Sequence, residues 1–285
     1  MVSLLQSLLL VAHLLCNAIA AGGPMAAAVL PCPSKVRRRL AGTSTIALVA
    51  GLVAGGLSSL IILAGEWPQY ASAAGRLPPR AYLMLASEWA FSVVLMIVYY
   101  YSWARLGGRR LLHGAIGVVA ATNLLYHFPT MMVVLRLLAE QPDRASELLV
   151  TREVFLRVLW MPLPIGLTLH FWGLSAVTTG LIVHLLAGIG NGSGGQVGAG
   201  LGLAGVLLMF VSGVWCVLYL PASDARRLLS WSDAPGWFFW GGIACGVALA
   251  VSLLAGVCAA GQRKWTSATL AAVAAAMMVA ATRSL

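Results

Sequence analysis

The stretch LLHGAIGVVAATNLLYHFP, residues Leu111–Pro129, is almost wholly apolar, yet it carries a histidine near each end, at His113 and His127. An apolar stretch of this length favours a helix that crosses a membrane. Ionisable side chains are costly inside a bilayer, so the two histidines mark a candidate functional segment.

The composition agrees with a membrane protein. Of the 285 residues, 60% are hydrophobic and 9% are charged, and the mean hydropathy is +0.91. A soluble domain carries about 25% charged residues. We therefore predict an all-α, polytopic transmembrane bundle that forms one integral membrane domain over residues 1–285. The predicted spans are eight, at residues 4–30, 43–65, 82–103, 111–138, 156–188, 199–220, 236–259 and 266–283.

Basic residues cluster in short segments between the spans. KVRRR (Lys35–Arg39) follows the first span, RLGGRR the third and QRKW the seventh. The positive-inside tendency places these segments in the cytoplasm, and both termini then lie outside a bacterial-type inner (plasma) membrane. The net charge of +10 is distributed among such loops, so it does not indicate nucleic acid as a partner.

Two connecting segments have a distinctive composition. Residues 139–156 are the most polar part of the chain and predict an amphipathic helix on the outer membrane surface. Residues 188–200 read GIGNGSGGQVGAG and follow the fifth predicted span. This composition predicts a glycine-rich linker without a phosphate-binding motif. No catalytic motif appears, and the five cysteines form no CxxC pair.

A second stretch repeats the histidine pattern. LHFWGLSAVTTGLIVHLL, residues Leu169–Leu186, carries His170 and His184, again fourteen positions apart. On a helix this spacing returns the second ring to within about 40° of the first, about 21 Å further along the axis. Each helix therefore presents two imidazoles on one face, whereas His13 has no partner at this spacing.

The two helices are consecutive and antiparallel, which predicts two facing histidine pairs. His113 would face His184 near the cytoplasm, and His127 would face His170 near the outer surface. Paired imidazoles are the axial ligands that a low-spin b haem requires, so we expect two haem b groups, with the four histidines as ligands of the iron.

Small residues and cations near the histidines fit the same expectation. Haem needs room between helices, which Gly117, Gly166 and Gly180 would provide. Its propionates need cationic partners. Those expected are Arg105 and Arg109 for the inner haem, and Arg136 and Arg157 for the outer one.

The positions His113, His127, His170 and His184 resemble the haem-ligating histidines of cytochrome b in the quinol:cytochrome c oxidoreductases. The likeness covers two of the eight predicted spans, and the PEWY signature of that family is absent. The resemblance implies electron transfer across the membrane, as a subunit of a respiratory or photosynthetic complex. Its partners would be membrane lipid, other redox subunits or a soluble cytochrome, and quinone.

Two other functions remain open at this point. Buried histidines and methionines in eight spans are also typical of copper-resistance membrane proteins of the CopD type, where histidines would pass Cu(I). The third class is a non-redox structural or assembly subunit, whose histidines pair with polar neighbours. Whether the chain is itself an enzyme or only an electron-transfer subunit also stays open.

Overall fold

The protein is described by a computed structural model that covers residues 2–62, 64, 68–106, 109–139, 151–187, 194–258 and 264–283. Within these ranges the chain forms helices and no strands, so the predicted all-α class is confirmed. The long helices are α1 (Val2–Val29), α2 (Ser34–Ile61), α4 (Pro79–Tyr101), α6 (Arg110–Ala139), α8 (Pro162–Ala187), α9 (Gly194–Leu218), α11 (Ala234–Cys258) and α12 (Lys264–Arg283). The short ones are α3 (Pro68–Gly75), α5 (Trp103–Leu106), α7 (Arg152–Leu159) and α10 (Ala222–Leu229).

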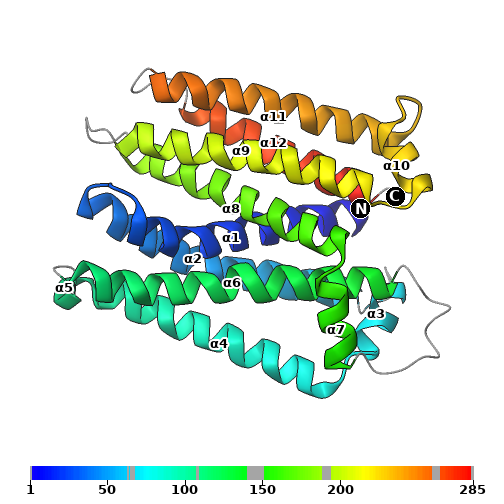
Figure 1. Cartoon of the computed structure of the whole chain (residues 1–285), viewed down its shortest axis with the longest axis horizontal. Coiled ribbons are helices and arrows are strands. Elements are labelled where there is room, and N and C mark those ends of the chain that lie inside the picture. The colour runs from blue at the N-terminus through cyan, green and yellow to red at the C-terminus, as the bar shows by residue number, and fades with distance from the viewer. Residues whose placement is uncertain are drawn as a thin grey trace.

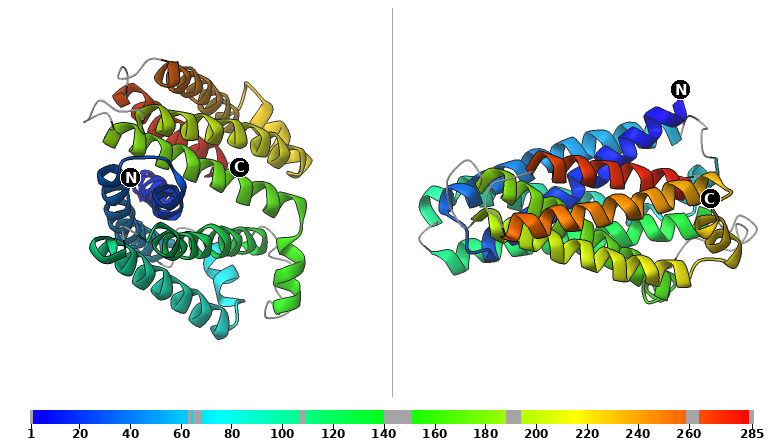
Figure 2. Two further views of the ribbon diagram at one scale, coloured as in Figure 1. Left: turned by 60° about the vertical axis from the view of Figure 1, so that its left-hand side comes forward. Right: turned by 90° about the horizontal axis from the view of Figure 1, so that it is seen from above.

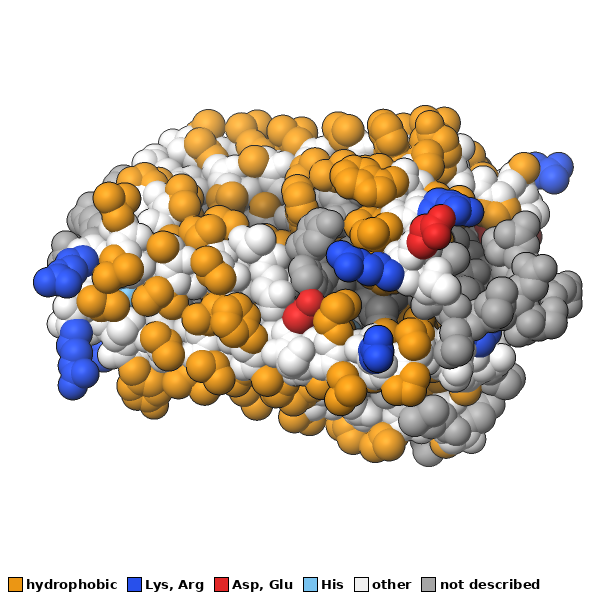
Figure 3. All heavy atoms as spheres, turned by 60° about the horizontal axis from the view of Figure 1, so that its bottom comes forward, with side chains coloured by type: hydrophobic (Ala, Val, Ile, Leu, Met, Phe, Trp, Pro, Cys, Tyr) orange, Lys and Arg blue, Asp and Glu red, His pale blue; other side chains and the backbone are white. Residues whose placement is uncertain are grey.

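The long helices run lengthwise beside one another (Figure 1). Six of them, α1, α2, α4, α8, α9 and α11, are long and apolar enough to cross a membrane among the residues described. Hydrophobic side chains are spread along much of the face shown in Figure 3. A helical bundle with an apolar exterior is the expected form of a chain whose solvent is lipid, since every backbone group must find its partner within the protein.

Helix α1 lies in the interior of the bundle (Figure 2). It packs against α2, α6, α8 and α12. Its contacts are made by small side chains, and Ala18, Ala20 and Ala21 are fully buried. Small residues let neighbouring backbones approach closely, which is the usual basis of helix association in membranes. Helix α1 therefore separates much of α6 from α8.

The bundle has two chemically different ends. At one end, α1 turns into α2 and α5 joins α4 to α6; we call this the basic end. The opposite end holds α3, α7 and α10, together with the start of α1 and the end of α12 (Figure 1). The two ends match the predicted division between cytoplasmic and outer segments. Which side of a membrane each end occupies stays a prediction.

Several boundaries differ from those predicted. Helix α2 begins at Ser34, so KVRRR forms helical turns and not a loop. Its 28 residues span about 42 Å at the helical rise, more than a hydrocarbon core about 30 Å thick, so the basic turns can extend beyond the apolar layer.

The predicted fifth span divides into α7 and α8. Pro162 is the first residue of α8, a position that suits proline because the missing N–H would have no helical partner there. Helix α7 covers the last residues of the predicted amphipathic segment, and residues 140–150 lie outside the described residues. The predicted glycine-rich linker is shorter than expected, since α9 already begins at Gly194.

Helices α8 and α9 form the most extensive helix pair of the bundle. Gly173 lies against Gly205, and Gly180 lies against Gly202. Gly173 and Gly180 belong to one heptad stripe along α8, in which the spacing alternates between four and three residues. A stripe of this period keeps one face of a helix against its partner over several turns. Its members are Gly166, His170, Gly173, Val177, Gly180 and His184.

The close approach of α8 and α9 requires glycine. A Cβ atom built on Gly180 would collide with the backbone nitrogen of Gly202 and would lie 2.6 Å from the carbonyl oxygen of Gly198. Both obstacles are backbone atoms, so they cannot move aside without separating the helices. Gly200, on the same helix α9, has no atom near the corresponding position.

We expect Gly180→Ala to lower the stability of the protein, because overpacking of this kind costs about 1–3 kcal/mol. The matched variant Gly200→Ala should leave stability unchanged or raise it slightly. Thermal unfolding of the purified protein in mild detergent measures both. Equal stability of the two variants would show that α8 and α9 are not packed backbone against backbone.

Candidate functional site

His113 lies buried on α6 at the basic end. Its Nε2 atom is 2.9 Å from the carbonyl oxygen of Tyr99, which can only accept, so Nε2 carries the hydrogen. The ring stacks on Tyr99 with a centroid distance of 4.3 Å and lies perpendicular to the ring of Trp103 with a centroid distance of 4.5 Å. Tyr99 is in the last turn of α4, where carbonyl groups lack helical partners. His113 therefore caps the C-terminal end of α4.

His184 lies buried on α8, also at the basic end. Its Nδ1 atom donates to the carbonyl oxygen of Gly195 at 2.7 Å. A Cβ built on Gly256 of α11 would lie 3.2 Å from Cε1 of this ring. The imidazole is thus enclosed by α8, the first turn of α9, and α11.

His170 lies two heptads earlier on α8 and also turns toward α9. Its Nδ1 atom is 3.2 Å from Oγ of Ser212. The Ser212 hydroxyl donates its own hydrogen to the carbonyl of Leu208 at 2.7 Å, so it accepts from His170. In both His170 and His184 the hydrogen is therefore on Nδ1, which leaves Nε2 as the nitrogen with a lone pair.

His13, on α1, forms a hydrogen bond to the backbone of α2. Its Nδ1 atom donates to the carbonyl oxygen of Gly51 at 2.8 Å, and its Nε2 atom is 3.0 Å from the amide nitrogen of Asn17. Since the amide nitrogen donates and the carbonyl accepts, both ring nitrogens are satisfied in one neutral tautomer. This agrees with a structural role.

The predicted inner pair is at one level but is not brought together. Tyr99, beside His113, shares a buried cluster with Val183 and Ala187, which flank His184. Both histidines thus lie at the basic end, as expected. However, His113 faces α4 and α5 while His184 faces α9 and α11, and α1 packs against both α6 and α8.

The predicted outer pair, His127 and His170, is divided between α6 and α8. His127 is on α6, but its side chain lies outside the described residues. Helices α6 and α8 meet nearby, where the indole nitrogen of Trp172 donates to the carbonyl of Leu125 at 3.0 Å. His170 points toward Ser212 of α9, away from this contact.

The glycines expected to leave space for haem are packed against other helices. A Cβ on Gly117 would lie 3.1 Å from the carbonyl oxygen of Pro24, and one on Gly166 would lie 2.6 Å from Cδ1 of Trp215. Gly180 contacts α9, as described above. These glycines serve close contacts between helices.

The expected propionate partners lie at the two ends of the bundle. Arg105 on α5 and Arg109 before α6 are exposed at the basic end. Arg157 on α7 forms an exposed ion pair with Glu153 at 3.1 Å. The side chain of Arg136 lies outside the described residues.

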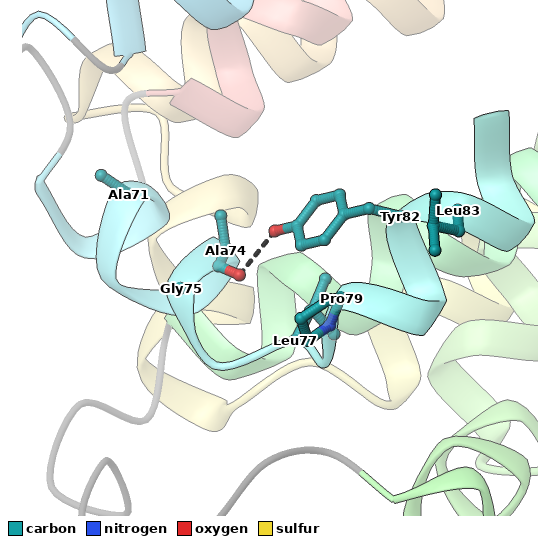
Figure 4. A pocket seen from close by; sticks show the side chains of 7 residues that line it. All are labelled: Ala71, Ala74, Gly75, Leu77, Pro79, Tyr82 and Leu83. Atoms are coloured by element: carbon teal, nitrogen blue, oxygen red, sulfur yellow. Dashed lines mark hydrogen bonds between the residues drawn. The ribbon is translucent and has the colours of Figure 1, made fainter.

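Two hollows on the described surface are large enough to consider as ligand sites, and neither of these two is lined by a histidine. One, of about 630 Å³, lies between α3 and α4. Figure 4 shows its mainly apolar wall, where the Tyr82 hydroxyl donates to the carbonyl of Ala74 at 2.5 Å. This hollow contains no cluster of polar groups that would orient a ligand. The other is at the basic end.

The histidine side chains that the structure describes do not form the ligand pairs that a b haem requires. A low-spin b haem requires two imidazoles that face each other across the macrocycle. Among the side chains described, no such facing pair occurs, and Nε2 of His113 is already bonded to Tyr99. No group of three His, Cys, Asp or Glu side chains in the described part of the chain could hold a metal ion. The two-haem site stays a prediction.

The partners of the histidines were not foreseen from the sequence. Tyr99, Trp103 and Ser212 lie in apolar spans where nothing distinguishes them from other packing residues. A signal was nevertheless present, since fourteen residues are two heptads. On α6 the same period connects His113, Gly117, Ala120, Leu124 and His127, and the first four of these are buried.

The fold and the histidine contacts define the class as a helical bundle of the multi-pass membrane type, with polar links between its helices. Comparison of the chain with models of protein families, with curated proteins and with solved structures found no match.

We expect Ser212→Ala to destabilise the protein by about 1 kcal/mol, the scale of a hydrogen bond between membrane helices, because the bond between Nδ1 of His170 and the Ser212 hydroxyl is lost. Ser212→Thr keeps a hydroxyl and should recover part of the loss. The control is Ser59→Ala, an exposed serine on α2 that bonds only within its own helix. Thermal unfolding in detergent measures all three, and equal effects at Ser212 and Ser59 would contradict the assigned contact.

Proposed function

We propose that the protein is a non-catalytic integral membrane subunit, a helical scaffold whose histidines fasten neighbouring helices. One observation carries the proposal: each histidine whose side chain is described bonds to a polar group on another helix. His13 bonds to α2, His113 to α4, and both His170 and His184 to α9. This is the third of the functions that the sequence left open.

The energetics of a bilayer support this role. A polar ring in lipid without a partner is costly, and bonds between membrane helices contribute about 0.6 kcal/mol on average and about 1.7 at most. Several such bonds, each between a different pair of turns, fix the register of helices whose apolar surfaces are otherwise alike. Neutral imidazole suits this purpose because it donates at one nitrogen and accepts at the other.

We further propose that all eight long helices cross the membrane and that the basic end faces the cytoplasm of a bacterial-type inner membrane. Helices α6 and α12 run alongside the six helices that meet length and hydropathy criteria (Figure 1). Nine of the 18 Lys and Arg residues fall in the short segments of the basic end, and none of the acidic residues do. Both termini would then be outside.

A second candidate is electron transfer through haem b, in a respiratory or photosynthetic complex with quinone or a soluble cytochrome as partner. One observation favours it. Ligating histidines usually donate the nitrogen that does not bind the metal to a carbonyl or similar group. His170 and His184 have this arrangement, with Nδ1 donating and Nε2 left with a lone pair. If haem binds, these two are the oriented ligands, and haem would supply one-electron chemistry. Copper transport, the remaining alternative, stays a prediction from the sequence.

Absorption spectroscopy on the purified full-length chain tests the proposal. Expression in a haem-replete host should give protein without stoichiometric b haem in reduced-minus-oxidised spectra and haem assays. Two low-spin b haems per chain would overturn the scaffold proposal and favour electron transfer.

Variants add a positive test of the scaffold role. We expect His113→Phe and His184→Phe each to lower stability by about 1 kcal/mol. Phenylalanine keeps an aromatic ring at each position but cannot form the hydrogen bond. The control Tyr101→Phe removes an exposed hydroxyl from α4 and should have no effect. If both histidine variants match the control in thermal unfolding, the proposed fastening role fails.

A further inference from the structure

The second hollow is a groove of about 630 Å³ at the basic end, where α2 lies beside the ends of α4, α5 and α8. We call it the basic groove. It is lined by Ser34, Lys35, Arg38, Arg39, Gly42, Thr43, Ile46, Tyr100, Trp103 and Leu186. None of these residues takes part in the histidine contacts except Trp103.

The groove changes in character along α2. Lys35, Arg38 and Arg39 line its outer part, and Gly42 and Ile46 follow at helical spacing on the same side. From Lys35 to Ile46 the helix rises about 17 Å. The groove thus passes from cations at the end of the bundle to apolar wall within the span, which is the order of groups in a phospholipid.

The cations of the groove have no acidic partner at their end of the molecule. The segments KVRRR, RLGGRR and QRKW contain no Asp or Glu, and all eight acidic residues fall elsewhere in the sequence. On the face shown in Figure 3, basic side chains stand at the left-hand end, and the acidic ones lie away from it. An anion that binds here would meet little repulsion.

The start of α2 adds to this positive potential. Pro33 precedes the helix and provides no side-chain cap for its first N–H groups. These groups carry the positive end of the helix dipole, which favours anions. The planar guanidinium groups of Arg38 and Arg39 are suited to the oxygens of a phosphate.

The inner wall is aromatic and is held in place. Arg37 lies over the ring of Trp103, 5.7 Å from its centroid, and Trp103 packs on Tyr99. A Cβ on Gly42 would lie 3.0 Å from Cε2 of Tyr100, so glycine keeps this part of the groove open. Tryptophan and tyrosine are typical of the membrane interface, at the level of lipid headgroups.

We propose that the basic groove binds one anionic phospholipid. The phosphate lies against Lys35, Arg38 and Arg39, and an acyl chain follows α2 toward Ile46. A topology signal alone would need the charges but not the groove, whereas a lipid site needs both. The inference does not rest on the proposed scaffold function.

Native mass spectrometry of the full-length chain in mild detergent tests this, with phosphatidylglycerol as probe and phosphatidylcholine of the same acyl chains as reference. We expect preferential binding of phosphatidylglycerol. The double variant Arg38→Gln/Arg39→Gln should weaken it about 25-fold, since each basic residue near anionic lipid contributes about fivefold. The matched control Arg80→Gln/Arg152→Gln removes the same charge from exposed sites at the opposite end and should bind normally.

A second variant tests the shape of the groove separately from its charge. Gly42→Leu fills the apolar part and keeps every cation, so we expect weaker binding of phosphatidylglycerol. Size-exclusion profiles show whether the Gly42→Leu variant folds. If it does not fold, the two arginine double variants alone test the proposal. Three results would overturn the proposal: equal loss in both arginine double variants, no preference over phosphatidylcholine, or saturation of the site by inorganic phosphate at the same concentration as the lipid.

Discussion

The contact between α8 and α9 is the constraint on which much of the arrangement depends. Glycines on both helices allow backbone to meet backbone, and a Cβ on Gly180 would collide with α9. Because the stripe has a heptad period, every residue in it faces the same helix. His170 and His184 are members of the stripe, so their rings turn toward Ser212 and Gly195. The packing of the helices therefore decides the chemical surroundings of the histidines.

Helix α1 is the second feature that determines the surroundings of the histidines. Its buried alanines allow α6 and α8 to pack on it from different sides, and His113 and His184 are consequently separated although they lie at the same level. The ring of His113 instead bonds to the last turn of α4. In a bilayer, where water cannot satisfy a free carbonyl, such a cap has a clear structural value. The same rings that suggest haem ligands from the sequence thus also serve as connections between helices.

The unequal charge of the two ends has a physical consequence beyond topology. Cations without carboxylate neighbours create a positive potential, and at the basic end that potential lies beside an apolar groove. At the opposite end Arg157 has Glu153 as a partner, so its charge is locally balanced. A surface that joins cations to an apolar wall fits an amphiphile better than a soluble anion.

The sequence by itself determined the all-α membrane class, the approximate positions of the long helices and the shared face of His170 and His184. These follow from local properties, namely hydropathy over the length of a span and the 3.6-residue period. Only the tertiary structure decided which helix that face meets. Apolar spans are alike in composition, and the choice between α6 and α9 depends on Gly173, Gly180, Gly202 and Gly205 together with the placement of α1. Those contacts join residues far apart in the chain, and no local pattern around the histidines contains them.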